Sequence, residues 1–118
     1  PELDEAIDII GLKDCQCVLM SQEPGMFNMW HNDEYGSYGE RDKSQIRRVL
    51  IFLTRYEPCQ FMQWGDTIMQ DWKPGDVICD WGKLSHGTAN ASEKTRVMLR
   101  LTGVVSDTYN NFIENYFK

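Results

Sequence analysis

The sequence lacks any concentration of basic residues. It carries 12 Lys and Arg against 18 Asp and Glu, for a formal net charge of −6, and its longest basic run is the pair Arg47–Arg48. Nucleic-acid binding depends on a basic surface patch, so this balance argues against a nucleic-acid partner. No apolar run reaches the length of a bilayer span either, and we therefore expect no membrane partner.

Cysteines are few, and their spacing does not suggest a metal or disulfide framework. The four are Cys15, Cys17, Cys59 and Cys79, and only the first two lie close together in sequence. A four-thiolate zinc site needs two closely spaced pairs, and disulfide scaffolds are typical of shorter secreted chains. We interpret the cysteines as free, mostly buried thiols and expect a reducing, cytoplasmic location.

What the sequence does contain is a series of short β-type segments separated by turn residues. The length of 118 residues allows one domain, 1–118. Turn signals stand at 23–25, 65–66 and 73–75, where Pro74–Gly75 fits a type II turn. The segments between them are CQCVLMS, MFNMWH, IRRVLIFLTRY, CQFMQW, TIMQDW, DVICDW and TRVMLRLTG.

Seven or eight such strands with few helices favour an all-β sandwich or small barrel. A jelly roll, the double-stranded β-helix, is one natural way to close the chain without exposed edges. We expect a short helix at one or both ends. One candidate ends at Gly11, and the other covers 107–117, with Asp107 or Thr108 as its N-cap.

Histidine is scarce, with only His31 and His86 in the chain. His31 stands two residues before Asp33 in MWHNDEY, and in a strand such residues point to the same face. Taken alone, a His-x-Asp pair is more often an ordinary polar pair. Together with His86, in a Ser-His-Gly loop, it would form the facial triad typical of non-haem Fe(II) sites, while zinc is chemically compatible with the same ligands.

The segment WKPGDVICDWGKLSHGTANASEKTRVMLRL resembles the distal half of the Fe(II)/2-oxoglutarate-dependent oxygenases. There a Gly-Asp turn leads into a strand, a ligand His follows, and an Arg about ten residues later binds the co-substrate. The segment looks most similar to the aspartyl/asparaginyl β-hydroxylase branch, at Trp72, Asn90 and Arg96. A His-Gly start and a nearby Asn also occur in the phytanoyl-CoA hydroxylase-like branch. The resemblance covers residues 29–103.

Two departures separate the chain from the β-hydroxylase branch. That branch often lacks the carboxylate ligand, whereas Asp33 supplies one here. It also has an Arg-x-His pair on the strand after the first ligand, and here Arg47 is followed by Val49. An aspartyl or asparaginyl substrate is therefore not implied.

The resemblance implies roles for further residues. Arg96 would bind the far carboxylate of 2-oxoglutarate, because guanidinium offers a planar, charged donor pair. Arg100, four residues on and on the same strand face, is the second candidate, and Asn90 is a further cofactor-binding candidate. The loop after Asp33 would carry substrate contacts, and its candidates are Tyr35, Tyr38 and Arg41.

The function implied is a hydroxylase that uses Fe(II) and 2-oxoglutarate, releases succinate and CO₂, and acts on a small molecule or an amino-acid side chain. A homo-oligomer would supply the bracing that N-terminal helices give to larger relatives. The chief alternative is a cupin-type metal-dependent protein on the same barrel, without 2-oxoglutarate chemistry. A further alternative is a non-catalytic β-sandwich with an accidental triad.

Overall fold

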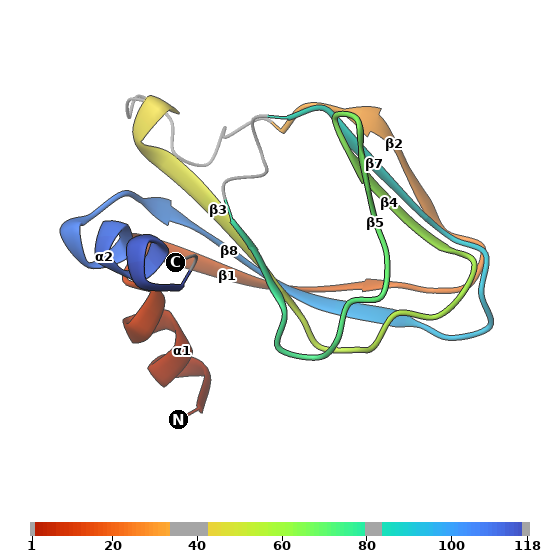
Figure 1. Ribbon diagram of the computed structural model, residues 1–118, viewed down its shortest axis with the longest axis horizontal. Helices are drawn as coiled ribbons and strands as arrows, with labels where there is room; N and C mark the ends of the chain where they lie inside the picture. The colour runs from red at the N-terminus through yellow and green to blue at the C-terminus, as the bar shows by residue number, and fades with distance from the viewer. Residues whose placement is uncertain (1, 34–42, 80–83, 117–118) are drawn as a thin grey trace.

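The computed structural model describes residues 2–33, 43–79 and 84–116. It confirms the prediction of an all-β double-stranded β-helix, with a short helix at each end (Figure 1). In chain order the elements are α1 (Glu2–Ile10), β1 (Lys13–Gln22), β2 (Phe27–His31), η2 (Lys43–Gln45), β3 (Ile46–Phe52), β4 (Gln60–Trp64), β5 (Thr67–Met69), β6 (Val77–Cys79), β7 (His86–Asn90), β8 (Arg96–Val104) and α2 (Asp107–Tyr116).

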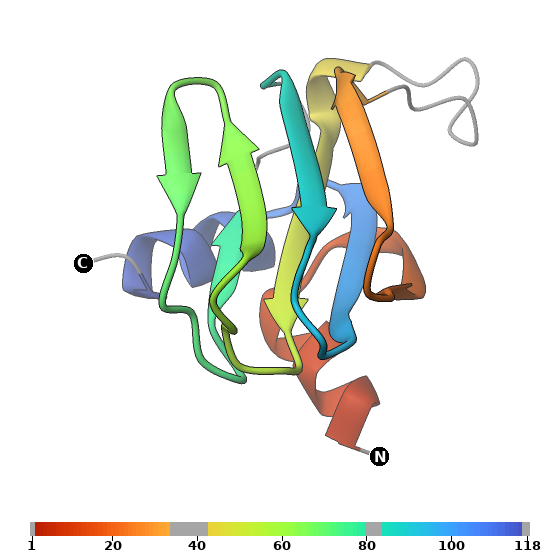
Figure 2. The same ribbon diagram turned by 90° about the vertical axis from the view of Figure 1, so that its right-hand side faces the viewer.

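The strands form two four-stranded antiparallel sheets that face each other (Figure 1). Sheet A has the order β1-β8-β3-β6, and sheet B has the order β2-β7-β4-β5. Figure 2 shows sheet B face-on, with β2 and β5 at its edges. Strands that are far apart in sequence, such as β2 and β7, therefore become neighbours, and this pairing positions the candidate site.

The strand β3, inside sheet A, is buried on both faces, which explains its continuous apolar character. Leu50 and Phe52 point toward sheet B and belong to the core between the sheets, whose other buried members are Met62, Trp64, Trp72 and Met98. Val49 and Leu101 point the other way, into a second cluster that contains Ile10, Leu12 and Tyr109. Both helices cover this outer face of sheet A (Figure 1).

The N-cap prediction for the C-terminal helix is wrong by one or two residues. The cap is Ser106, whose Oγ accepts a hydrogen bond from the Tyr109 amide at 3.0 Å and donates one to the Gly11 carbonyl. Ser, Asp and Thr all favour caps, so the contact with the end of α1 decides among them, and local sequence does not show it.

Three further expectations can be compared with the structure. Gly75 has φ +92°, as the predicted turn at Pro74 requires. All four cysteines are free, but none is buried: Cys17, on the edge strand β1, and Cys59, in the turn before β4, are exposed. Within the described ranges, neither helix is long and apolar enough to cross a bilayer.

Candidate metal centre

The strand β2 carries the first two candidate ligands at its end. His31 is the last residue of β2, and Asp33 follows two residues later. The pairing of β2 with β7 joins Asn28 to Thr88 but His31 to His86, so β2 holds one extra residue between the pairs. Such a bulge re-aims the side chains beyond it, and here it places His31 directly opposite His86.

The third candidate, His86, opens β7 rather than lying in a loop as the sequence suggested. Its side chain is buried, between the rings of His31 at 4.4 Å and Trp64 at 6.4 Å. A Cβ on Gly87 would lie 3.4 Å from the Asn28 carbonyl oxygen. A glycine at 87 therefore lets β2 approach β7 closely beside the two imidazoles.

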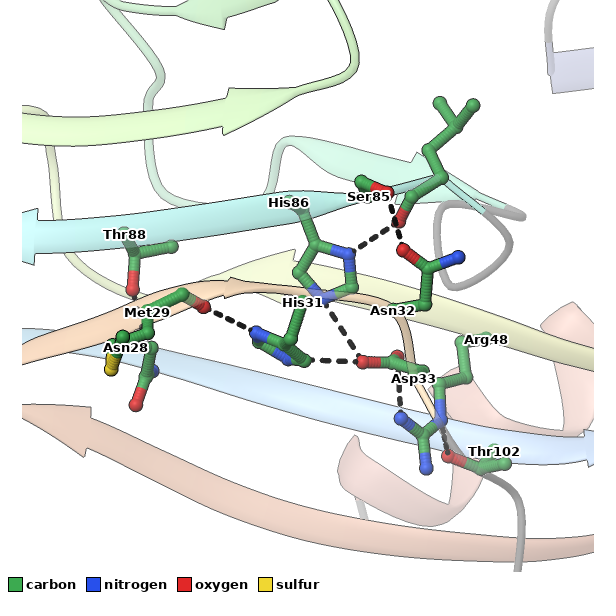
Figure 3. A network of polar contacts seen from close by, with 11 residues as sticks. Asn28, Met29, His31, Asn32, Asp33, Arg48, Ser85, His86, Thr88 and Thr102 are labelled. Carbon is green, nitrogen blue, oxygen red and sulfur yellow. Dashed lines mark hydrogen bonds and ion pairs between the residues drawn. The ribbon is translucent and has the colours of Figure 1, made fainter.

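The three predicted ligands converge, as Figure 3 shows. The Nε2 atom of His86 lies 3.0 Å from Asp33 Oδ1, and the Nε2 atom of His31 lies 3.4 Å from the same oxygen. One donor atom from each residue falls within 4.8 Å of the others. The geometry is that of a set of ligands able to hold one metal ion.

Backbone contacts determine which nitrogen of each imidazole faces Asp33. His31 Nδ1 lies 2.6 Å from the Met29 carbonyl oxygen, and His86 Nδ1 lies 2.7 Å from the Leu84 carbonyl oxygen (Figure 3). A carbonyl oxygen only accepts, so both Nδ1 atoms carry hydrogen. In a neutral ring, Nε2 then presents a lone pair to a carboxylate oxygen. The contact between Nε2 and the carboxylate oxygen is favourable only when a proton or a cation lies between the two atoms. Metal-binding histidines have the same arrangement, in which one ring nitrogen donates to a carbonyl and the other faces the ion.

Arg48, on β3, holds the other oxygen of Asp33. Its Nη1 lies 2.5 Å from Asp33 Oδ2, and its Nε donates to Thr102 Oγ1 at 3.1 Å. Both side chains of the ion pair are less than a tenth exposed. Arg48 thereby fixes the carboxylate so that Oδ1 faces the two imidazoles.

Sequence reasoning did not identify Arg48. Its position in the sequence could have indicated a buried role, because Arg48 lies two residues before Leu50 and four before Phe52, on the inward face of an apolar strand. A charged residue in that alternation usually has a buried partner.

The electrostatics of the site follow from these contacts. Burial lowers the pKa of His86, but the hydrogen bonds to Asp33 and to the Leu84 carbonyl, together with the charge of Asp33, raise it above the ordinary value overall. Burial raises the pKa of Asp33, yet the hydrogen bonds from His86 and Arg48 lower it overall. Without metal, these contacts favour the protonated form of His86 and the ionised form of Asp33.

A cavity of about 60 Å³ opens beside the ligands. Arg96 and Arg100 line it from the inward face of β8, with Met98 between them. Arg96 is 3% exposed, and its Nε and Nη1 find no hydrogen-bond partner among the described residues. Arg100 Nε is likewise without a described partner. Burial lowers the pKa of Arg96 to about 10, so it is still charged at neutral pH.

The remaining predicted residues do not lie at the cavity or are outside the described part of the chain. Asn90 is fully buried, but its amide donates to the Gln22 and Lys94 carbonyls and accepts from Ser92, and it does not line the cavity. These contacts give Asn90 a structural role in the turn after β7, and its cofactor-binding role stays a prediction. The proposed substrate-loop residues Tyr35, Tyr38 and Arg41 lie outside the described residues.

Neither a protein-family model nor a curated protein sequence matches this chain. Solved structures match it in fold. The plu4264 protein from Photorhabdus luminescens has a TM-score of 0.56 and 11% identity, over 92% of this chain and 78% of that one. A cupin domain from Bordetella pertussis Tohama I has a TM-score of 0.54 and 12% identity, over 78% and 82%. A "predicted oxalate decarboxylase" from Thermotoga maritima has a TM-score of 0.53 and 16% identity, over 75% and 65%.

The fold is that of the cupins. The resemblance to the Fe(II)/2-oxoglutarate oxygenases is therefore wrong. In the structure, the segment that carried this resemblance consists of a turn at 73–75, a His at the start of β7 and an Arg at the start of β8. The spacings follow from the lengths of these strands and turns, so they do not by themselves identify a chemistry.

The buried ion pair should contribute strongly to the stability of the metal-free protein. Arg48→Met leaves the Asp33 carboxylate buried without the guanidinium that pairs with its Oδ2, so we expect the free energy of unfolding to fall by about 3 kcal/mol. Chemical denaturation measures it. The matched control is Arg55→Met, since the Arg55–Glu57 pair spans 3.8 Å and Arg55 is 79% exposed, and it should be nearly neutral. Equal effects of the two variants would contradict the role given to Arg48.

Metal binding should weaken as the pH falls. His86 must release its Nε2 proton to bind a cation, and because its pKa is raised above 6.5, the weakening begins at a higher pH than for an ordinary histidine. We expect the Kd for Co(II) to rise about tenfold for each pH unit below that pKa. Calorimetric titration between about pH 5.5 and 8.5 measures this. A Kd that is constant over this range would exclude His86 as a ligand.

Proposed function

We propose that this chain is a cupin-type, metal-dependent enzyme that acts on a small anionic molecule. The observation that carries the proposal is the approach of two imidazole Nε2 atoms to one oxygen of Asp33, at 3.0 and 3.4 Å. His31, Asp33 and His86 would hold one divalent transition metal. Two imidazoles and one carboxylate favour Fe(II) among the candidates.

The protein's own groups prepare the site for such an ion. Hydrogen bonds from both Nδ1 atoms orient the imidazoles, and Arg48 orients the carboxylate. A bond from Ser85 to Asn32 ties the segment before β7 to the segment after β2 (Figure 3). When bound, the metal would supply Lewis acidity and open coordination positions to a substrate.

The anionic character of the substrate is supported by the arginines in the cavity. A buried guanidinium without a partner is costly, and a carboxylate is the group that best satisfies its planar donor pair. Arg96, with Arg100 as second candidate, would therefore orient a substrate carboxylate beside the metal. The apolar wall of Leu50, Met62, Trp64 and Met98 would restrict access of water.

Two further observations support the proposal. One of the matched structures is described as a predicted oxalate decarboxylase, which is an enzyme that acts on a small carboxylate. The four free cysteines are compatible with the cytoplasmic location that we propose.

The experiment is a metal titration of the purified protein. We expect one Fe(II) or Co(II) per chain by elemental analysis after dialysis, and loss of that ion in His86→Ala and Asp33→Asn. Asp66→Asn, which changes an exposed carboxylate in the turn before β5, is the matched control and should retain the ion. Equal metal content in Asp33→Asn and the wild type would contradict the proposed centre.

The same samples separate this proposal from an oxygenase activity. Incubation with Fe(II), ascorbate and 2-oxoglutarate should yield no succinate above the level of the His86→Ala variant. Metal-dependent succinate formation would overturn the choice of a cupin-type activity.

A further inference from the structure

A second space, a groove of about 400 Å³, lies between the edge strands β1 and β2. It adjoins the cavity beside His31, Asp33 and His86, which we call the metal-side cavity. The volume of the groove is in the range of small-molecule pockets. Half of its lining side chains are apolar. The lining residues are Leu19, Met20, Ser21, Gln22, Met26, Asn28, Arg96 and Met98.

The groove and the metal-side cavity share a wall. Met20, Asn28, Arg96 and Met98 line both spaces. The cavity, at about 60 Å³, has room for only a few heavy atoms, since one water requires about 10–15 Å³ of the same measure. A larger ligand that reaches the metal ligands must therefore extend past these four residues into the groove.

Arg96 stands at this boundary. It opens β8 opposite Gln22 of β1, is 3% exposed, and has two donors, Nε and Nη1, that meet no acceptor in the described part of the chain. An anionic group at the junction of cavity and groove would accept from both.

The groove beyond Arg96 suits an apolar chain. Three of the six methionines of the sequence line it, and thioether side chains adapt to flexible apolar ligands. Leu19 and Met26 are 66% and 49% exposed, so a chain lying there would remove apolar surface from water.

Together these features point to the substrate class, on the basis of the proposed function. We infer that the ligand is a carboxylate with an apolar chain. Its carboxylate pairs with Arg96 at the junction, and its chain occupies the groove between β1 and β2.

A series of soluble straight-chain carboxylates tests this directly. We expect the Kd measured by calorimetry on the Co(II)-loaded protein to fall from acetate to butyrate, hexanoate and octanoate, by about threefold per methylene while the groove fills. The matched ligands 1-octanol and octylamine should bind at least about tenfold more weakly than octanoate, because neither offers an anion to Arg96.

Two variants locate the ligand. Met26→Ser, which alters the groove but not the cavity, should weaken octanoate much more than acetate. The control Ile68→Ser changes a similarly exposed apolar side chain on β5, at the opposite edge of sheet B, and should change the binding of neither carboxylate. Arg96→Lys keeps the charge but loses the planar fork, and should weaken every carboxylate by about tenfold, with circular dichroism to verify folding.

Several results would overturn the inference. A Kd that does not depend on chain length would show that the chain does not occupy the groove. Octanol that binds as tightly as octanoate would show that Arg96 does not recognise a carboxylate. An equal loss in Met26→Ser and Ile68→Ser would place the chain elsewhere. A dimer that dissociates in Met26→Ser, with unchanged octanoate binding, would identify the groove as an interface between copies. Failure of the proposed function appears separately: the protein then binds no Co(II), while the same titrations made without metal still show the chain-length dependence.

Discussion

The contacts of one carboxylate organise the site. Asp33 presents Oδ1 to His31 and His86 and gives Oδ2 to Arg48. Because both imidazoles donate from Nδ1 to backbone carbonyls, they turn their other nitrogen toward Oδ1. The two imidazoles and the carboxylate are thus held at a spacing that suits one cation between them.

The double-stranded β-helix brings these groups together from distant parts of the chain. Pairing of β2 with β7 places His31 opposite His86, and β3 in the facing sheet contributes Arg48. The alternation of β8 then aims Arg96, Met98 and Arg100 at the same space. The site therefore depends on the pairing of β2 with β7 and of β3 with β8 rather than on any contiguous motif.

Much of this arrangement was accessible from sequence, because it rests on short-range patterns. Period-two alternation and turn residues predicted the strands, and the scarcity of histidine made His31 and His86 the natural partners of Asp33. The strand β7 was missed because its residues HGTAN have no apolar alternation. Its strand character comes from pairing on both sides, with β2 and β4.

Other features depend on tertiary contacts and could not be inferred locally. The bulge in β2, the ion pair of Arg48 and the cap at Ser106 each involve residues far apart in sequence. The spacing from His86 to Arg96 suggested one enzyme superfamily, yet in the structure it is the length of β7 and of the turn that leads to β8. Strand geometry was therefore more predictable than chemistry.

Anomalous diffraction from a crystal grown with Co(II) is the most direct measurement of whether these side chains form a metal centre. We expect one strong peak between the sheets, at about 2.0–2.2 Å from Nε2 of His31, Nε2 of His86 and one oxygen of Asp33. A crystal that contains Co(II) only at other positions, with the two imidazoles turned away from Asp33, would contradict the metal centre and the function built on it.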